Sequence, residues 1–335
     1  MNNFLSKVFT YYPKIIVEHT SRNLRYYQAK ILHKKKLSPY YLSIYSMMLQ
    51  DANYSPGKWW ENLAKNMHKE LISKGLSNFK RGYFNKHFVG RFPSGTLEHS
   101  ALWQYYRNVK SKDRLKILDK VQEPDVGNPY KINLDGKKIT WDFIQSIDEF
   151  YHIIDTFNIE VNDRLVICEI GGGYGRLAHL FLETMPRCHY VLVDIPTTLI
   201  IAYYYLHKVF AKDIYTYEES RKTDVYDKDV FMKKRLSFLV PNKFFKIEKS
   251  TVDLFINIDS FQEMTAEIVK QYLHRIKELK GNYLYIKNSK DPVHNLVDTK
   301  SFKLLDYPKH IGMNIIKSEP STAYADMIEQ FIKLN

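Results

Sequence analysis

The chain of 335 residues contains only two cysteines, Cys168 and Cys188, which is too few for the disulfide framework of a secreted protein. It also lacks an uninterrupted apolar run long enough to span a bilayer, and its first residues do not form a signal peptide. These absences predict a reducing, cytoplasmic setting. The apolar (44%) and charged (26%) fractions are those of a globular protein with a sizeable core.

Acidic residues are outnumbered, with 37 Asp and Glu against 50 Lys and Arg, and the net charge is +13. Such an excess indicates nucleic acid, an anionic membrane or an acidic substrate as partner, or only a general lysine bias. Residues 1–37 combine basic and apolar side chains. A basic amphipathic segment of this kind either lies on an anionic membrane or packs on the protein with its lysines in water. The sequence leaves both alternatives open.

Glycine is sparse as well, with 13 residues, yet Gly171, Gly173 and Gly175 follow one another in the spacing G-x-G-x-G. The apolar run before them predicts a buried strand and the residues after them a helix. The dinucleotide fingerprint G-x-G-x-x-G is not met, because arginine stands at its last glycine. Glu169 precedes the loop by two residues. The pattern E-x-G-x-G-x-G resembles the first motif of class I S-adenosylmethionine (SAM) methyltransferases, and the acid suits a ligand that carries an ammonium and a sulfonium.

A second predicted strand, residues 190–194, ends in Asp194 about 20 residues after the glycine loop. An acid at this place hydrogen-bonds ribose hydroxyls in nucleotide-binding α/β folds. The alternative is that Glu169 and Asp194 only cap helices. Both acids together with both strands favour SAM as the cofactor.

Further strands and helices alternate along the chain. Strands are predicted at residues 236–240, 252–259 and 283–287, helices at 140–158, 196–210 and 265–280, and a closing antiparallel pair around 311–316. The expected fold is therefore α/β, with a Rossmann-like, mostly parallel sheet covered by helices on both faces.

The domain plan has three parts: a basic N-terminal segment (1–37), a helical region on the substrate side (38–120) and a SAM-binding domain (121–335). Asp135 and Gly136 predict the turn of a small hairpin. Residues 211–235 are rich in charge and predict an exposed insertion. His179 on an apolar helix face is expected to be a core residue.

In such a sheet ligands bind beyond the carboxyl ends of the strands, and the exit of the fourth strand, residues 257–264, is dense in polar groups. It lacks the Asn/Asp-Pro-Pro-aromatic motif of enzymes that methylate exocyclic amines. Transfer to a hydroxyl is an in-line displacement that a general base assists. The candidate bases and orienting groups are Glu263, Asp259, His294 and His99.

Glu263 is the preferred base, with capping of the next helix as its alternative role. Asp259 is expected to orient substrate or cofactor. No metal is expected, because no carboxylate pair follows the fourth or fifth strand and no zinc-ligand spacing is present.

Several segments together resemble the sugar O-methyltransferase family of bacterial surface-polysaccharide gene clusters. They are Glu123-Pro124, Val126-Gly127-Asn128-Pro129, the motif from Glu169 to Ala178, Val193-Asp194-Ile195-Pro196, Phe238-Leu239-Val240-Pro241 and Asn257 to Met264. The resemblance implies SAM-dependent methylation of a sugar hydroxyl on a glycan or glycan precursor. The cofactor positions it implies are Glu169, Gly171, Gly172, Gly173, Tyr174, Asp194, Ile195 and Asn257.

The implied acceptor is a free or lipid-linked glycan, which would place the protein in the cytoplasm at the inner face of the membrane. Two other functions remain open. An RNA methyltransferase would use the positive charge, although no RNA-binding module is recognisable and nucleic acid is the less expected partner. The third hypothesis is a non-catalytic scaffold with the fold of a SAM-dependent enzyme. The presence of both Glu169 and Asp194 argues against it.

Overall fold

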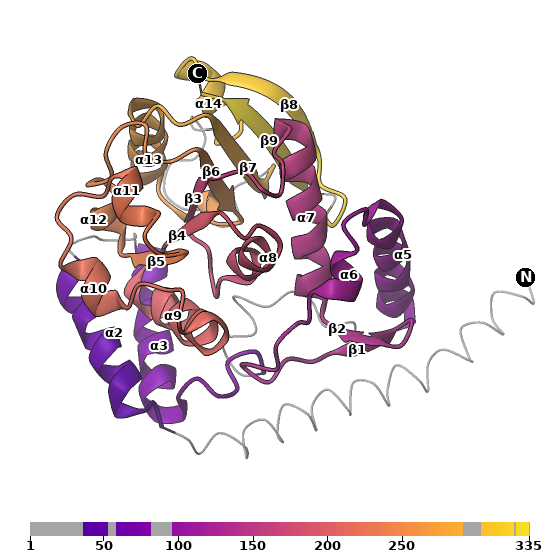
Figure 1. Ribbon diagram of the computed structural model, residues 1–335, viewed down its shortest axis with the longest axis horizontal. Helices are drawn as coiled ribbons and strands as arrows, with labels where there is room; N and C mark the ends of the chain where they lie inside the picture. The colour runs from indigo at the N-terminus through magenta and orange to yellow at the C-terminus, as the bar shows by residue number, and fades with distance from the viewer. Residues whose placement is uncertain (1–35, 53–57, 82–95, 291–302, 325, 335) are drawn as a thin grey trace, which may run out of the picture. The chain divides into compact units, whose positions relative to one another are not determined.

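The computed structural model describes residues 36–52, 58–81, 96–290, 303–324 and 326–334. The chain forms two compact units (Figure 1). Over the described residues, one comprises Ser38–Lys69 and Asp148–Asn335, and the other comprises Glu70–Ile147. The unit borders fall within two helices, α3 (Lys58–Lys74) and α7 (Trp141–Phe157). The borders near residues 37 and 120 that the sequence suggests stay predictions.

A seven-stranded sheet forms the centre of the larger unit. Its order is β5 (Leu236–Leu239), β4 (His189–Val193), β3 (Val166–Ile170), β6 (Leu254–Ile258), β7 (Tyr283–Ser289), β9 (Met327–Lys333) and β8 (Asn314–Pro320). Strands β3 to β7 are parallel, whereas β9 runs antiparallel to both of its neighbours. The α/β fold with a mostly parallel sheet is confirmed, and so is the closing antiparallel pair.

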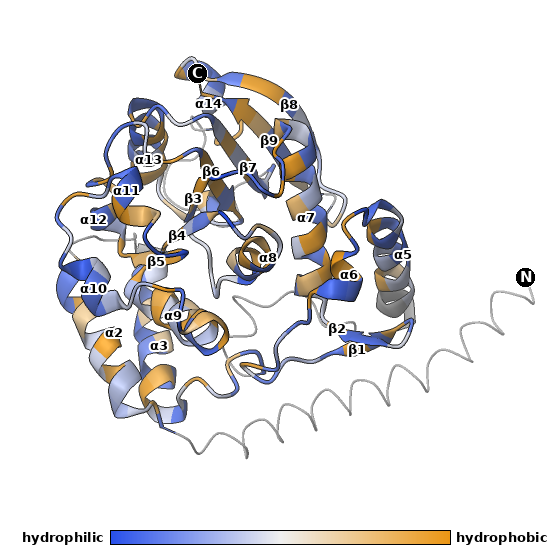
Figure 2. Ribbon diagram, viewed as in Figure 1, coloured by the Kyte–Doolittle hydropathy of each residue, from blue (hydrophilic) through white to orange (hydrophobic). Residues whose placement is uncertain are grey.

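Helices cover both faces of this sheet (Figure 1). On one face, alternate strand residues such as Cys168, Val191 and Phe255 join a core with α11 (Lys228–Phe231), α12 (Pro241–Phe244) and α13 (Ala266–Glu278). The opposite face is covered by α7, α8 (Arg176–Thr184) and α9 (Pro196–Phe210). On this face the rings of Phe181 and Tyr190 lie 5.8 Å apart. In Figure 2, α8 and α9 are coloured mainly as hydrophobic.

The predicted core position of His179 is confirmed. His179 is 2% exposed, and its ring contacts those of Tyr205 and Phe210. Cys168 and Cys188 are buried free thiols.

Helix α2 (Pro39–Asp51) packs on α9 through hydroxyl groups. The hydroxyls of Tyr40 and Tyr203 lie 2.7 Å apart, and the hydroxyl of Tyr41 lies 3.1 Å from Nδ1 of His207. At the end of α2, Asp51 accepts hydrogen bonds from Tyr217 and Arg221. Residues from the N-terminal part of the chain are thereby fixed beside the sheet.

The segment 211–235, predicted as an exposed insertion, does expose most of its charged residues, but it also has a buried apolar side that the prediction missed. It contains α10 (Tyr217–Arg221) and α11, and its apolar residues Ile214, Tyr217, Tyr226 and Phe231 are at most 2% exposed. The charged residues dominate the composition and are mostly exposed, and the hydrophilic helix α10 is blue in Figure 2. The buried side consists of a few widely spaced, mostly aromatic residues, which cannot be recognised from the overall composition of the segment.

The second unit contains α5 (Thr96–Lys112), α6 (Ile117–Lys120) and the hairpin of β1 (Ile132–Leu134) and β2 (Lys137–Ile139). The turn has positive φ at Asp135 (49°) and Gly136 (79°), which confirms the predicted Asp-Gly hairpin. In the larger unit, the short helices η1 (Phe261–Glu263) and α14 (Tyr307–His310) complete the elements of the described residues. Within the described residues, no helix is both long and apolar enough to cross a membrane.

Candidate active site

The glycine loop connects β3 to α8 at the carboxyl edge of the parallel strands. Its backbone has positive φ at Gly171 (75°), Gly173 (60°) and Gly175 (84°), a conformation that side chains disfavour. The N–H of Gly171 donates to the carbonyl of Val193 at 2.8 Å, which fastens the loop to β4. Gly175 is the N-cap of α8 and has no side chain with which to cap it. The N–H groups of the first helical turn therefore suit an anionic group.

Two glycines of the loop also meet side chains at close range. A Cβ atom at Gly171 would lie 1.9 Å from Oγ of Ser260, and one at Gly172 would lie 2.7 Å from Oε2 of Glu169. The loop thus rests on the residues after β6 as well as on its own strand. Ser260 was not singled out in the sequence, since only the folded chain shows this contact.

Replacing Gly171 with alanine is expected to weaken SAM binding at least tenfold. The left-handed backbone costs an alanine about 1–2 kcal/mol, and the methyl group collides with Ser260. Gly136→Ala is the matched control, because Gly136 has a similar φ of 79° and no atom within 4 Å of the added Cβ. Isothermal titration calorimetry on both variants measures the difference. Equal affinities in the two variants would contradict the importance of the loop.

Glu169 lies beneath the loop with 4% of its surface exposed. The hydroxyl of Tyr190 donates to its Oε2 at 2.8 Å. Burial raises the pKa of Glu169 to about 7, while the bond from Tyr190 and the charge of Arg176 lower it. A buried carboxyl of this kind gains stability when a positively charged group comes close.

Asp194 follows β4 and holds the loop from its other side. Its Oδ2 accepts the N–H of Gly173 at 3.0 Å, and its Oδ1 accepts the N–H of Ile195 at 2.7 Å. Burial raises the pKa of Asp194 to about 7, which outweighs these two hydrogen bonds. Each carboxylate oxygen keeps a further lone pair for a ligand hydroxyl.

Glu263 lies at the end of η1 beside two further acids. Burial raises the pKa of Glu263 to about 8, the charges of Asp259 and Asp194 raise it as well, and a hydrogen bond with Trp60 lowers it. Helix α13 is capped by Thr265, whose hydroxyl accepts the N–H of Ile268, so Glu263 is not its capping group. The fold therefore brings Glu263 close to the acid of β4.

Asp259 is the most exposed of these acids. Its φ of 56° turns the chain away from β6, and Gln262 donates a hydrogen bond to its Oδ1. Loss of solvation raises the pKa of Asp259 to about 6, against the lowering effect of Arg176 and Lys287.

Trp60 of α3, which hydrogen-bonds to Glu263, was not predicted as a site residue. No local sequence signal connects it with Glu263, about 200 residues further along the chain.

Asn257 has a bracing role that its hydrogen bonds define. Its Nδ2 donates to the carbonyl of Ile170 at 2.8 Å, and its Oδ1 accepts from Phe261 N–H and from Asn288. It is fully buried and joins β3, β6 and β7. Tyr174 is also buried and packs edge-on against Tyr205 at 5.3 Å. Direct contacts of these two residues with a cofactor stay predictions.

Two candidate bases cannot be placed. His294 lies outside the described residues, and the side chain of His99 does as well. Their predicted roles therefore stay predictions.

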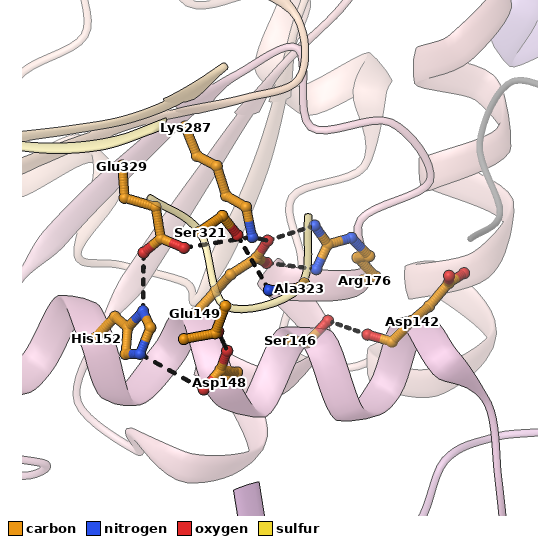
Figure 3. Close-up of polar contacts among 11 residues, drawn as sticks. Asp142, Ser146, Asp148, Glu149, His152, Arg176, Lys287, Ser321, Ala323 and Glu329 are labelled. Atoms are coloured by element: carbon orange, nitrogen blue, oxygen red, sulfur yellow. Dashed lines mark hydrogen bonds and ion pairs between the residues drawn. The ribbon is translucent and has the colours of Figure 1, made fainter. Parts of the chain in front are cut away.

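A buried ionic cluster fixes the start of α8 (Figure 3). Arg176 donates to Glu149 of α7 through both terminal nitrogens, at 2.5 and 3.1 Å, and Lys287 of β7 donates to the same carboxylate at 2.9 Å. Burial raises the pKa of Glu149, but Arg176 and Lys287 outweigh this effect and lower it to about 2. Glu149 thus ties the residue after the glycine loop to the neighbouring strand and helix.

Strand order, the glycine loop after the first parallel strand and the reversed last pair define the class I methyltransferase fold. Comparison with known proteins finds no matching family model and no matching curated protein. Among solved structures, a SAM-dependent methyltransferase from Aquifex aeolicus is 12% identical, with coverage of 69% of this chain and 98% of its own and a TM-score of 0.39.

Two further solved structures are similar in the same way. Magnesium protoporphyrin IX methyltransferase from Synechocystis, solved with bound S-adenosylhomocysteine (SAH), is 13% identical, with coverage of 70% and 98% and a TM-score of 0.38. Fibrillarin from Aeropyrum pernix, solved with bound SAM, is 10% identical, with coverage of 60% and 80% and a TM-score of 0.38. These three proteins are only distantly similar to the chain, and its chemistry is therefore inferred from its own residues.

Proposed function

We propose that this protein is a SAM-dependent O-methyltransferase that acts on a sugar hydroxyl of a glycan or glycan precursor. The observation that carries the proposal is the gathering of Glu169, Asp194, Asp259 and Glu263 around the glycine loop, with the pKa of each carboxyl raised. Such a concentration of acidic groups, of which all but Asp259 are buried or partly buried, is unfavourable by itself. It becomes favourable when a cationic ligand lies among the carboxylates.

The residues fit SAM in both charge and shape. Its carboxylate end suits the uncapped N-terminus of α8, and its ammonium and sulfonium suit the acids. Asp194 at the end of β4 suits the ribose hydroxyls. The groups that would hold SAM are thus Glu169, the backbone of Gly171–Gly173, Asp194 and Ile195.

Bound SAM supplies a methyl group on a positively charged sulfur that departs as a neutral thioether. Glu263 would act on the acceptor. As the hydroxyl oxygen bonds to the methyl carbon, the O–H proton passes to the carboxylate of Glu263. Trp60 would hold that carboxylate in place through its hydrogen bond. A base with a raised pKa accepts a proton more readily than an ordinary glutamate, which suits a weakly acidic sugar hydroxyl.

Three observations support a sugar hydroxyl rather than a nucleobase amine. The strand exit Asn257-Ile258-Asp259-Ser260 lacks the prolines of the amine-methylating motif. The carboxyl group of Glu263 is available as a general base, and a hydroxyl needs such a base more than an amine does. The segments around Val126-Gly127-Asn128-Pro129 and Ser260-Phe261-Gln262-Glu263-Met264 resemble those of sugar O-methyltransferases.

The affinity for SAM is expected to rise by about tenfold between pH 6 and pH 8, and more steeply than the affinity for SAH. Below pH 7 the carboxyls of Glu169 and Asp194, each with a pKa of about 7, are mostly protonated, so Glu169 no longer offers a negative charge to the sulfonium. Above pH 7 the two carboxyls are ionised. Because SAH lacks the sulfonium charge, its affinity should rise less than that of SAM. Calorimetric titrations across this range measure both ligands; a constant SAM-to-SAH affinity ratio would speak against carboxylates at the sulfur.

The function is tested by incubating the full chain with methyl-labelled SAM and separate pools of lipid-linked glycan intermediates, nucleotide sugars and RNA. Label in a glycan fraction, stable to conditions that cleave esters, supports a sugar ether. Label in RNA would instead favour an RNA methyltransferase, in which the net charge of +13 attracts the nucleic acid. SAM binding without transfer to any fraction would favour a non-catalytic role.

A further inference from the structure

Away from the glycine loop, the edge of the sheet brings two glutamates face to face. Glu319 of β8 and Glu329 of β9 are direct partners in the antiparallel ladder, so their side chains point to the same face. Like charges in this position repel each other. His152 of α7 lies against the same face, with Nδ1 2.8 Å from Oε2 of Glu329. One ligand atom from each of the three residues lies within 4.8 Å of the other two.

The carboxylates around this group outnumber the fixed cations, so the charge is balanced by a further cation, either a protonated His152 or a bound ion. Asp148, Glu149, Glu319 and Glu329 provide four carboxylates, and Arg176, Lys287 and Lys317 provide three fixed cations. Glu329 is 0% exposed, its Oε1 lies 3.6 Å from Nζ of Lys287, and Tyr285 hydrogen-bonds to the same carboxylate. Burial of this carboxylate is compensated only by the cations and donors that lie close to it.

The surroundings of His152 match those of a metal-binding imidazole. While Nδ1 faces Glu329, Nε2 lies 3.5 Å from Oδ1 of Asp148 (Figure 3). Thr322 in turn donates a hydrogen bond to Oδ2 of Asp148. A carboxylate that accepts the second N–H of a histidine fixes the ring and directs the lone pair of the other nitrogen. In the structure Nδ1 donates its proton to Glu329, and an ion that displaces this proton would meet a lone pair directed towards the two glutamates.

We propose that His152, Glu319 and Glu329 form a binding site for a divalent first-row transition metal ion such as Zn²⁺. One imidazole nitrogen and two carboxylates are a ligand set for such an ion, whereas magnesium and calcium prefer oxygen alone. With bonds of about 2.0–2.2 Å, an ion holds its ligand atoms roughly 3–3.5 Å apart, so small side-chain rotations suffice. Water fills the remaining positions, because the side chain of Glu319 is 33% exposed.

The site differs from the acceptor site and departs from the sequence-based expectation of no metal. That expectation considered carboxylate pairs after the parallel strands and short ligand spacings. The ligands found here are 167 and 177 residues from His152 in the sequence, and only the packing of α7 on the β8–β9 pair brings them together. Through Glu329 and Lys287 the ion would adjoin the cluster that holds Arg176.

The test is metal binding by the full-length protein after chelator treatment and dialysis. We expect one equivalent of Zn²⁺ per chain, measured by calorimetry and elemental analysis, and visible absorption bands when Co²⁺ replaces it. Glu319→Gln and His152→Gln are expected to abolish the stoichiometric binding, and Asp148→Asn to weaken it about ten- to a hundredfold. Glu278→Gln, at an exposed carboxylate on α13, is the matched control and should bind as the unaltered protein does.

Several results would overturn the site. One is that the unaltered protein takes up neither Zn²⁺ nor Co²⁺. In that case a protonated His152 would occupy the space between Asp148 and Glu329. Another is equal uptake of Zn²⁺ by the unaltered protein and by Glu319→Gln. Glu319 lies at a part-exposed position on the edge of the sheet, and circular dichroism verifies that this variant is folded. SAM titrations of the same samples are independent of both outcomes, because neither Glu319 nor His152 belongs to the residues assigned to SAM.

Discussion

Replacing Glu263 with glutamine is expected to slow methyl transfer about a hundred- to ten-thousand-fold, the usual contribution of a general base. Glutamine keeps the size and the hydrogen bond with Trp60 but cannot take a proton from the acceptor hydroxyl. SAM affinity should change by no more than about threefold, because a charge acting on the acceptor contributes little to holding the cofactor. Single-turnover transfer from labelled SAM to the acceptor of the unaltered enzyme measures the rate.

Glu267→Gln is the control for this experiment. Glu267 is exposed in the first turn of α13, four residues further along the chain, so its loss should leave the rate unchanged. The pH profile separates catalysis from structure. The unaltered enzyme should gain activity as pH rises towards the pKa of Glu263, about 8, and the variant should lose this dependence. A Glu263→Gln enzyme with the full rate would assign the base to another residue.

Replacing Glu149 with glutamine is expected to lower the free energy of unfolding of the protein by about 3–5 kcal/mol, as removal of one partner from a buried ion pair does. Glu149 is fully buried and accepts hydrogen bonds from both Arg176 and Lys287. Without its charge the two cations remain in the interior with less compensation. Urea denaturation followed by circular dichroism measures the loss.

The same substitution is expected to weaken SAM binding, because Arg176 is the first residue of α8 and directly follows the glycine loop. Asp155→Asn serves as control, since Asp155 is an exposed acid on the same helix and exposed substitutions usually stay within about 0.5 kcal/mol. A loss below about 1 kcal/mol in Glu149→Gln would mean that water or neighbouring groups already compensate the cluster.

The parallel strands and the loop between β3 and α8 could be predicted from the sequence, because each has a local cause. The run from Val166 to Ile170 is apolar, β-branched in part and bounded by turn residues. The glycines occupy positions with positive φ, and Thr265 caps α13 as its place before the apolar periodicity predicts. Alternation of strands and helices then leaves few arrangements for the sheet.

The remaining features depend on contacts between distant segments. The hydrogen bond of Trp60 with Glu263 joins residues 203 positions apart, and Lys287 meets Glu149 across 138 positions. In the sequence these side chains look like ordinary members of a helix and a strand. The burial of Tyr217 and Phe231 was missed for a related reason, because the charged residues between them conceal the inward-facing side.

Calorimetric titration of the unaltered protein with SAH, and then with NADH, tests the central claim most directly. The carboxylate-flanked loop predicts one molecule of SAH bound per chain, binding at least tenfold weaker in Gly171→Ala, and no measurable heat with NADH. Tight NADH binding without any response to SAH would contradict the assignment of this loop to SAM.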